Sequence, residues 1–359
     1  MKLHNKEIKD TTFVKKRLPV WDILKLFAIF LVIWGHSIAA FSSSIIDENP
    51  VYIWLNGFHV GLFMMVSGYF SSSALRLSPL RFLSKKLYQL IYPCFAWGGI
   101  KWIIIETTLI VSGGLASLSL SGLLSDLYWF SDFWFLKSCF LCFCIAYLGN
   151  MMPIKEKYWM PLTLIISQVI PPFSIPFMYP CFLIGIIIKK NEILMKGIVS
   201  HPIILFILFS AMLFFWDQEA WDKSHGIPTD IFTRDILYIT ELLFYRSYRL
   251  VLGVLGGLTF ISIFHNAFNK IFYSPIINTL SGWGKYTLEL YIVQSFVLEQ
   301  TLSRFIKFDN YSLAIFNFLI TPIASIVILL LCLYIIRLIY KSQKISKFLF
   351  AKENHNGFG

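Results

Sequence analysis

The sequence predicts an all-α polytopic membrane protein with about ten transmembrane helices and both termini in the cytoplasm. Of its 359 residues, 57% are hydrophobic and only 14% are charged, and the mean hydropathy is +0.68. Soluble domains carry about 25% charged residues. Apolar runs long enough to cross a bilayer recur along the chain, each needing about 20 residues. These three observations exclude an ordinary soluble domain.

The first apolar run follows a group of cations and carries Asp22, Lys25 and His36. It is too long for a signal peptide, so we interpret it as an uncleaved first helix. The fifth and sixth runs are short and meet at Pro171 and Pro172, which leaves a tilted or re-entrant pair open. The ten predicted spans cover residues 19–41, 51–74, 87–111, 133–150, 158–172, 174–188, 201–216, 248–265, 286–303 and 312–338.

The distribution of positive charge supports this topology. With the N-terminus inside, 22 of the 31 Lys and Arg residues fall in cytoplasmic segments and six in external ones. Cytoplasmic loops of membrane proteins carry such an excess. The net charge of +11 therefore indicates topology and contact with anionic membrane lipids rather than nucleic acid. We expect one transmembrane domain over residues 1–350 and a disordered tail over 351–359.

Two other features have plain interpretations. Cys139, Cys142 and Cys144 lie in an apolar run, where cysteine behaves as a small apolar residue, so we expect neither a metal site nor a disulfide framework. The longest external segment, about 217–247, is either a lid or sugar-contacting rim or a simple connector.

Placing an ionisable side chain inside a membrane span costs free energy, so such residues indicate a functional site. His36, His59, Glu106 and Lys137 are predicted at similar depth in the outer half of the first four spans. Histidine is the side chain best suited to proton transfer near neutral pH. The alternative for each histidine is a hydrogen bond between helices.

The cytoplasmic side carries two basic groups. Asp22 and Lys25 follow Arg17 at the start of the first span, and Lys25 shares a helix face with His36 because eleven residues make about three turns. The second group precedes the third span and contains Arg76, Arg81, Lys85 and Lys86. Such cations could hold phosphates, although they could also serve only as topology determinants. Asp22 and His36 are about 21 Å apart along a helix, so a ligand with a phosphate-rich head and a long thin arm would reach between the two polar regions.

Several motifs together resemble the acyltransferase-3 family of bacterial integral-membrane acyltransferases, and especially its fucose 4-O-acetylase-like members. They occur in the family's order and cover most of the chain. The motifs are Arg17-x4-Asp22-x2-Lys25 leading to Trp34-Gly35-His36, Phe58-His59-Val60-Gly61-Leu62-Phe63 followed by Ser67-Gly68-Tyr69, Phe82-x3-Lys86 with Pro93, Phe133-Trp134-Phe135-Leu136-Lys137, and Gly284-Lys285-Tyr286-Thr287-Leu288-x2-Tyr291.

The resemblance implies about ten helices in the bacterial cytoplasmic (inner) membrane, with both ends inside. It implies transfer of an acyl group, usually acetyl, from cytoplasmic acyl-CoA to a hydroxyl of an extracytoplasmic acceptor. His36 would be the essential catalytic histidine, and Arg17 and the basic group before the third span would face CoA. Two departures matter: Lys86-x-x-Gln89 stands where the family often has two arginines, and Gln294 replaces a frequent histidine.

The sequence thus predicts a membrane O-acyltransferase, most simply an O-acetyltransferase that modifies a glycan. Acetyl-CoA or another acyl-CoA would be a co-substrate, with no permanently bound cofactor. Arg17, Asp22, Lys25, Arg81, Lys85 and Lys86 form the predicted donor site. His36 would act as general base, with Tyr69, Lys137 or His59 stabilising the oxyanion or orienting His36.

The alternative is a flippase or exporter of a glycan or an acylated small molecule. A transporter of this kind often carries paired broken helices in two repeated halves, and the sequence shows no such repeat. The sequence leaves open whether the acceptor is a surface glycan, a lipid-linked sugar or a small molecule, whether the acyl group is acetyl or larger, and whether an acyl-enzyme forms.

Overall fold

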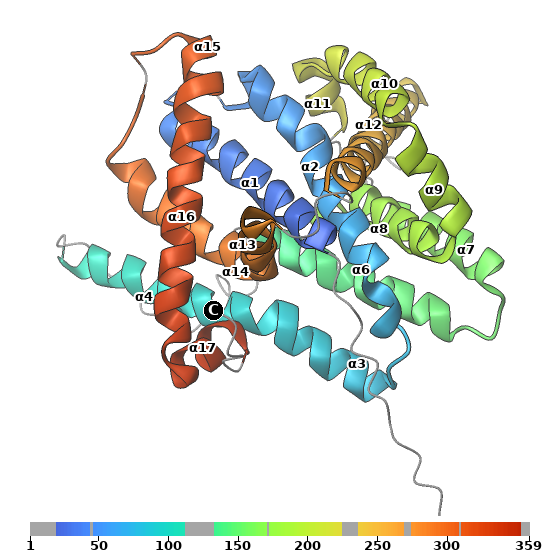
Figure 1. Ribbon diagram of the computed structural model, residues 1–359, viewed down its shortest axis with the longest axis horizontal. Coiled ribbons are helices and arrows are strands. Elements are labelled where there is room, and N and C mark those ends of the chain that lie inside the picture. The colour runs from blue at the N-terminus through green and yellow to red at the C-terminus, as the bar shows by residue number, and fades with distance from the viewer. Residues whose placement is uncertain are drawn as a thin grey trace, which may run out of the picture.

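The computed structural model describes residues 19–43, 46–111, 133–170, 172–224, 236–268, 274–308 and 310–352, and within these ranges every regular element is a helix (Figure 1). The predicted all-α class is therefore confirmed. The helices are α1 (Pro19–Phe41), α2 (Pro50–Tyr69), α3 (Pro79–Lys86), α4 (Tyr92–Val111), α6 (Trp134–Met151), α7 (Glu156–Gln168), α8 (Ile175–Lys190), α9 (Glu192–Ser200), α10 (Pro202–Phe214), α11 (Gln218–Ser224), α12 (Ile236–Phe268), α13 (Pro275–Trp283), α14 (Thr287–Ser295), α15 (Leu313–Ile315), α16 (Thr321–Tyr340) and α17 (Gln343–Phe350).

Five of the described helices are long and apolar enough to cross a membrane: α1, α2, α6, α12 and the continuous segment Leu313–Tyr340. The pair α9 and α10, bent by 76°, would make a sixth if it is one span. Ten spans and two cytoplasmic termini therefore remain predictions.

The short fifth and sixth spans correspond to α7 and α8, which have 13 and 16 residues. Between them the chain turns through left-handed backbone at Phe173 (φ 58°) and Ser174 (φ 53°). At 1.5 Å per residue, α7 is about 20 Å long, whereas the hydrocarbon core is about 30 Å thick. An upright α7 is thus too short to cross the core.

The centre of the molecule depends on close contact between α2 and α8. A Cβ atom on Gly68 would collide with the backbone carbonyl of Phe182, and one on Gly185 would collide with that of Met65. Small residues at such positions let helix backbones meet, as is common between membrane helices. The backbone of α2 is thereby fixed, and with it the side chains that α2 presents to α1 and α6.

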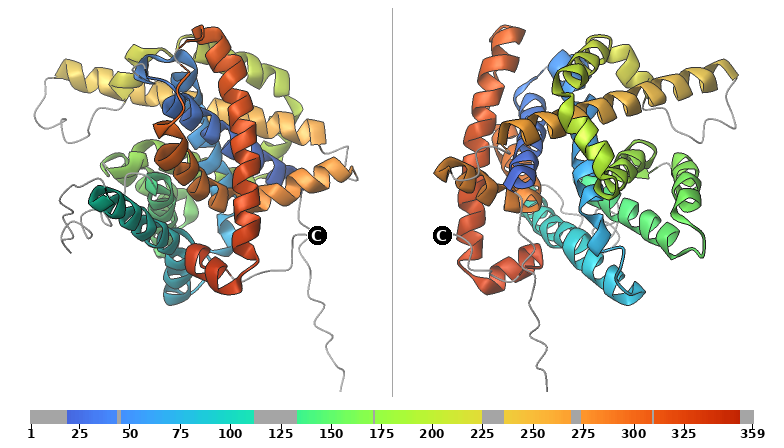
Figure 2. Two further views of the ribbon diagram at one scale, coloured as in Figure 1. Left: turned by 90° about the vertical axis from the view of Figure 1, so that its left-hand side faces the viewer. Right: turned by 45° about the vertical axis from the view of Figure 1, so that its right-hand side comes forward.

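A polar seam joins α1 to α16, the first and last long helices of the chain. The indole Nε1 of Trp34 donates to Oγ1 of Thr321 at 3.0 Å, and Oγ of Ser325 donates to Oγ of Ser37 at 3.0 Å. Both serines and the threonine are fully buried. The right-hand view of Figure 2 shows α16 along one side of the molecule, with the start of α12 extending from the other.

The external segment predicted over 217–247 is partly helical. It contains α11, and its last part, from Ile236, is the beginning of the 33-residue α12. The eighth predicted span therefore starts 12 residues too late, because polar residues such as Glu241 and Arg246 are carried on a helix that continues beyond the apolar run. Residues 225–235 lie outside the described part of the chain.

The C-terminal helix α17 packs against α4 and α16 (Figure 1). It ends at Ala351, whose backbone is left-handed (φ 54°, ψ 27°). Of the tail predicted over 351–359, the structure describes Ala351 and Lys352, and residues 353–359 lie outside the described part.

Candidate active site

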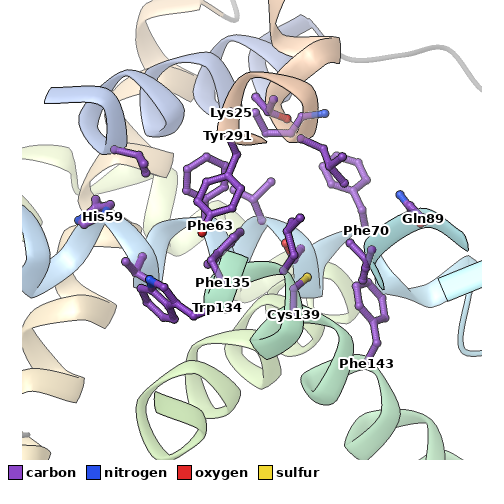
Figure 3. A pocket seen from close by; sticks show the side chains of 18 of the residues that line it. Lys25, His59, Phe63, Phe70, Gln89, Trp134, Phe135, Cys139, Phe143 and Tyr291 are labelled. Atoms are coloured by element: carbon purple, nitrogen blue, oxygen red, sulfur yellow. The ribbon is translucent and has the colours of Figure 1, made fainter. Parts of the chain in front are cut away.

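One elongated cavity of about 510 Å³ runs through the helical bundle. Its long walls come from α1, α2 and α6, and one end, the lysine end, is lined from α3, the turn before α14 and Lys352. In Figure 3, His59 and Trp134 lie toward one end, whereas Gln89 and Phe143 lie toward the other. Small-molecule sites typically occupy about 300–1,000 Å³, so the volume fits a substrate site.

His36 lies near the C-terminal end of α1 and lines the cavity. Its Nδ1 is 2.7 Å from Oε1 of Glu299, and the second oxygen of Glu299 accepts a hydrogen bond from Ser295 at 3.0 Å. Glu299 itself does not line the cavity. A carboxylate that accepts from Nδ1–H fixes the tautomer of the imidazole and leaves Nε2 as the basic nitrogen. This is the arrangement that a general base requires.

His59, on α2, is buried and lines the same cavity. Its Nδ1 donates to the backbone carbonyl of Leu55 at 2.5 Å. In the neutral ring the other nitrogen is then an acceptor. His59 therefore makes a hydrogen bond within its own helix, whereas the alternative interpretation expected one between helices, and it still presents a polar ring to the cavity.

Around the two histidines the cavity wall is aromatic and uncharged. Tyr52, Phe63, Trp134 and Phe135 contribute rings, and Asn56 contributes an amide. Within the described part of the chain, every lysine that lines the cavity comes from its lysine end, and no arginine lines it. An uncharged polar ligand fits the histidine end better than an anion does.

The lysine end has the opposite character. It is lined by five lysines from four separate segments of the chain: Lys25, Lys85, Lys86, Lys285 and Lys352. Two of them are paired with carboxylates, Lys25 with Asp22 at 2.6 Å and Lys352 with Glu289 at 2.5 Å. A cluster with more cations than carboxylates attracts a multiply charged anion.

Lys86 is the most enclosed of the five, because only 6% of the residue is exposed. Its Nζ lies 3.3 Å from the centre of the Phe143 ring and 3.4 Å from Oε1 of Gln89. Lys86 ends α3, immediately before the apolar run of the third predicted span. Burial, with a smaller contribution from the neighbouring Lys85, lowers the pKa of Lys86 to about 8.

Comparison with known proteins decides the class. Residues 19–337 match the family model of the acyltransferase domain Acyl_transf_3. The chain belongs to the acyltransferase-3 family. It is also similar to the nodulation protein NolL of Sinorhizobium fredii, with 28% identity over 189 residues that make up 48% of each chain. The chain thus spans about half the length of this curated relative. No solved structure matches the chain.

Family membership and the membrane-length helices make this protein a membrane acyltransferase. They favour the enzyme over the exporter. The cavity brings together five of the residues that the sequence predicted for this acyltransferase: His36, His59, Lys25, Lys85 and Lys86. Asp22 adjoins them through its ion pair with Lys25.

Besides Asp22, three predicted residues do not line the cavity. Tyr69 stacks on Trp21 with ring centres 4.0 Å apart, and Lys137 lies over the ring of Phe173 at 5.4 Å. Arg81 is exposed on α3. Tyr69 and Lys137 differ from expectation because successive side chains on a helix point about 100° apart, so a residue close to the cavity in sequence can face another part of the protein. Arg17 and the side chain of Glu106 lie outside the described part of the chain.

The sequence-based prediction missed Glu299, Lys285 and Lys352. Glu299 lies inside the ninth predicted apolar run, where any carboxylate needs a reason, so a signal was present. Lys285 belongs to a motif that was noted only as a resemblance. Lys352 had no signal, because its contact with Glu289 joins residues 63 apart in sequence. In the described residues no group of three or more His, Cys, Asp or Glu side chains could hold a metal ion.

Proposed function

We propose that this acyltransferase transfers an acyl group, most simply acetyl, from cytoplasmic acyl-CoA to a hydroxyl of an extracytoplasmic glycan or glycolipid. The observation that supports this proposal is one cavity with two chemically different ends. Lysines gather at one end, which the predicted topology would place in the cytoplasm, and His36 lies with aromatic and amide side chains at the other.

The lysine end suits the phosphates of CoA, because each ammonium group is a point charge with three hydrogen-bond donors. Lys25 and His36 both line the cavity and are eleven residues apart on α1, about 16 Å of helix rise. A donor held by its phosphates near Lys25 would extend its pantetheine arm along the cavity. Its thioester would then lie beside His36.

The other end suits a neutral sugar. Trp134 and Tyr52 offer ring faces, which pack against the C–H face of a sugar, and Asn56 offers an amide for its hydroxyls. His59 presents a nitrogen that can accept, but not donate, a hydrogen bond while its ring is neutral. We therefore assign His59 to orienting an acceptor hydroxyl rather than to stabilising an oxyanion.

In the proposed reaction, Nε2 of His36 removes the proton from the acceptor hydroxyl as its oxygen attacks the thioester carbonyl. The new C–O bond forms, and the tetrahedral intermediate collapses as the C–S bond breaks. The departing CoA thiolate receives the proton from Nε2. Glu299 stabilises the imidazolium that exists between these two proton transfers, because its carboxylate stays hydrogen-bonded to Nδ1.

The test uses the purified full-length protein in nanodiscs with radiolabelled acetyl-CoA and a panel of neutral glycans and lipid-linked sugars. We expect label on an acceptor with the wild type and at least a hundredfold loss with His36→Ala, since general-base catalysis contributes about 10²–10⁴. His201→Ala is the matched control, because His201 is exposed and its ring hydrogen-bonds to the carbonyl of Gly197, away from the cavity lining. A His36→Ala protein that labels the acceptor at the wild-type rate would disprove the assigned role, and acceptor transport without label transfer would indicate an exporter.

A further inference from the structure

We propose that Lys352, the second residue after α17, is a phosphate-binding residue of the acyl-CoA site and that the buried carboxylate of Glu289 holds it in place. This inference rests on the proposed use of acyl-CoA. It adds to the donor site a part of the chain beyond the family match, which ends at residue 337.

Glu289 provides the first observation. It is fully buried on α14, and its Oε1 accepts hydrogen bonds from the hydroxyl of Tyr340 at 2.8 Å and from Nζ of Lys352 at 2.5 Å. Its Oε2 has no hydrogen-bond partner within the described part of the chain. A buried carboxylate is strongly unfavourable without a cation beside it. Lys352 is the cation that contacts it. The need of this carboxylate for a cation therefore holds the segment after α17 against the bundle.

The path of the chain explains how Lys352 reaches this position. Phe350, at the end of α17, is 1% exposed and stacks on Tyr340 with ring centres 6.1 Å apart. The left-handed backbone of Ala351 then ends the helix and changes the direction of the chain. Lys352 follows directly and lines the cavity.

The third observation is that Lys352 has donors left over. An ammonium group has three N–H donors, and the structure gives Lys352 one partner, Glu289. Its side chain is 39% exposed and faces the same cavity end as Lys85 and Lys285. Within the described residues, Lys85 and Lys285 make no ion pair, so an anion entering here meets two unpaired ammonium groups and a third held by Glu289.

The experiment compares two donors and two lysines of the same segment. Lys352→Ala is measured against Lys344→Ala, because Lys344 is exposed on α17 and does not line the cavity. Binding of coenzyme A is measured by calorimetry on the full-length protein in nanodiscs, and KM and kcat are measured with acetyl-CoA and with S-acetyl-pantetheine, which lacks the phosphates.

We expect Lys352→Ala to raise the Kd of coenzyme A and the KM of acetyl-CoA about tenfold, the loss expected for one charge-assisted hydrogen bond. We expect kcat and the KM of S-acetyl-pantetheine to stay within twofold of the wild type. Lys352→Arg should retain most of the affinity. Equal Kd values for Lys352→Ala and Lys344→Ala would overturn the inference, as would an equal loss with both donors.

Lys352→Ala leaves Glu289 without its cation and can reduce folding. The double variant Lys352→Ala/Glu289→Gln removes that unpaired charge and is expected to show the same tenfold loss. If it binds coenzyme A as tightly as the wild type, the inference is wrong. Failure of the wild type itself to bind coenzyme A would instead reject the proposed function, and this inference with it.

Discussion

Glu299 should control the rate of acyl transfer without touching either substrate. Its Oε1 lies 2.7 Å from Nδ1 of His36, and it does not line the cavity. A hydrogen bond to a charged group contributes about 1.5–3 kcal/mol, and about 1.36 kcal/mol corresponds to tenfold in rate. Glu299→Gln keeps the size of the side chain but removes the charge that stabilises the imidazolium. We therefore expect kcat to fall about 10- to 100-fold.

The assay is steady-state transfer from acetyl-CoA, with KM and kcat determined separately for each substrate. Both KM values should stay within about twofold, because a positioning residue acts on the transition state. Glu299→Asp should recover part of kcat, and Glu48→Gln, an exposed carboxylate on the same chain, should leave it unchanged. A Glu299→Gln protein with unchanged kcat, or one that loses affinity and rate together, would refute the reasoning.

Two further outcomes follow from the geometry. Because the pKa of Lys86 is lowered to about 8, the ammonium group is present below that pH and lost above it, so the KM of acyl-CoA should rise as the pH increases through 8. Lys86→Arg should abolish this rise, since arginine stays protonated, and a rise that persists would contradict the assignment. Gly185→Ala should lower the thermal unfolding temperature and the yield of inserted protein, because its Cβ would collide with the carbonyl of Met65. Gly99→Ala meets open space and should unfold no earlier than the wild type; similar losses in both variants would disprove the packing argument.

The sequence predicts the helical class because apolar composition and periodic runs leave few alternatives. It does not predict helix lengths well. The chain around Pro171 and Pro172 reads as two spans, yet α7 is too short to cross the core upright. At α12 the predicted helix is instead too short, because charged residues before position 248 suggest a loop although they belong to the same continuous helix. In both cases tertiary packing, rather than local hydropathy, decides where a helix ends.

The sequence likewise predicts some parts of the candidate site and misses others. His36, Lys25 and Lys86 could be predicted, because charges within or beside apolar runs are conspicuous and helical spacing places two of them on one face. Glu299 and Lys352 could not be paired with their partners from sequence. Their hydrogen bonds join residues 263 and 63 apart, and such pairing depends on how separate helices pack. Tyr69 is predicted for the site because it lies in a family-like motif, but its ring packs on Trp21 and does not line the cavity.

The bonds between Trp34 and Thr321 and between Ser37 and Ser325 have a consequence for biosynthesis. A ribosome makes the chain from its N-terminus, so the helix that bears His36 is synthesised nearly 290 residues before the helix that satisfies its polar groups. During that interval its hydroxyls and indole must find temporary partners in the translocon, in water or in lipid headgroups. The proposed activity is thus acquired only once α16 has been made, and a nascent chain released earlier would lack the contacts that hold the helix of His36 in place.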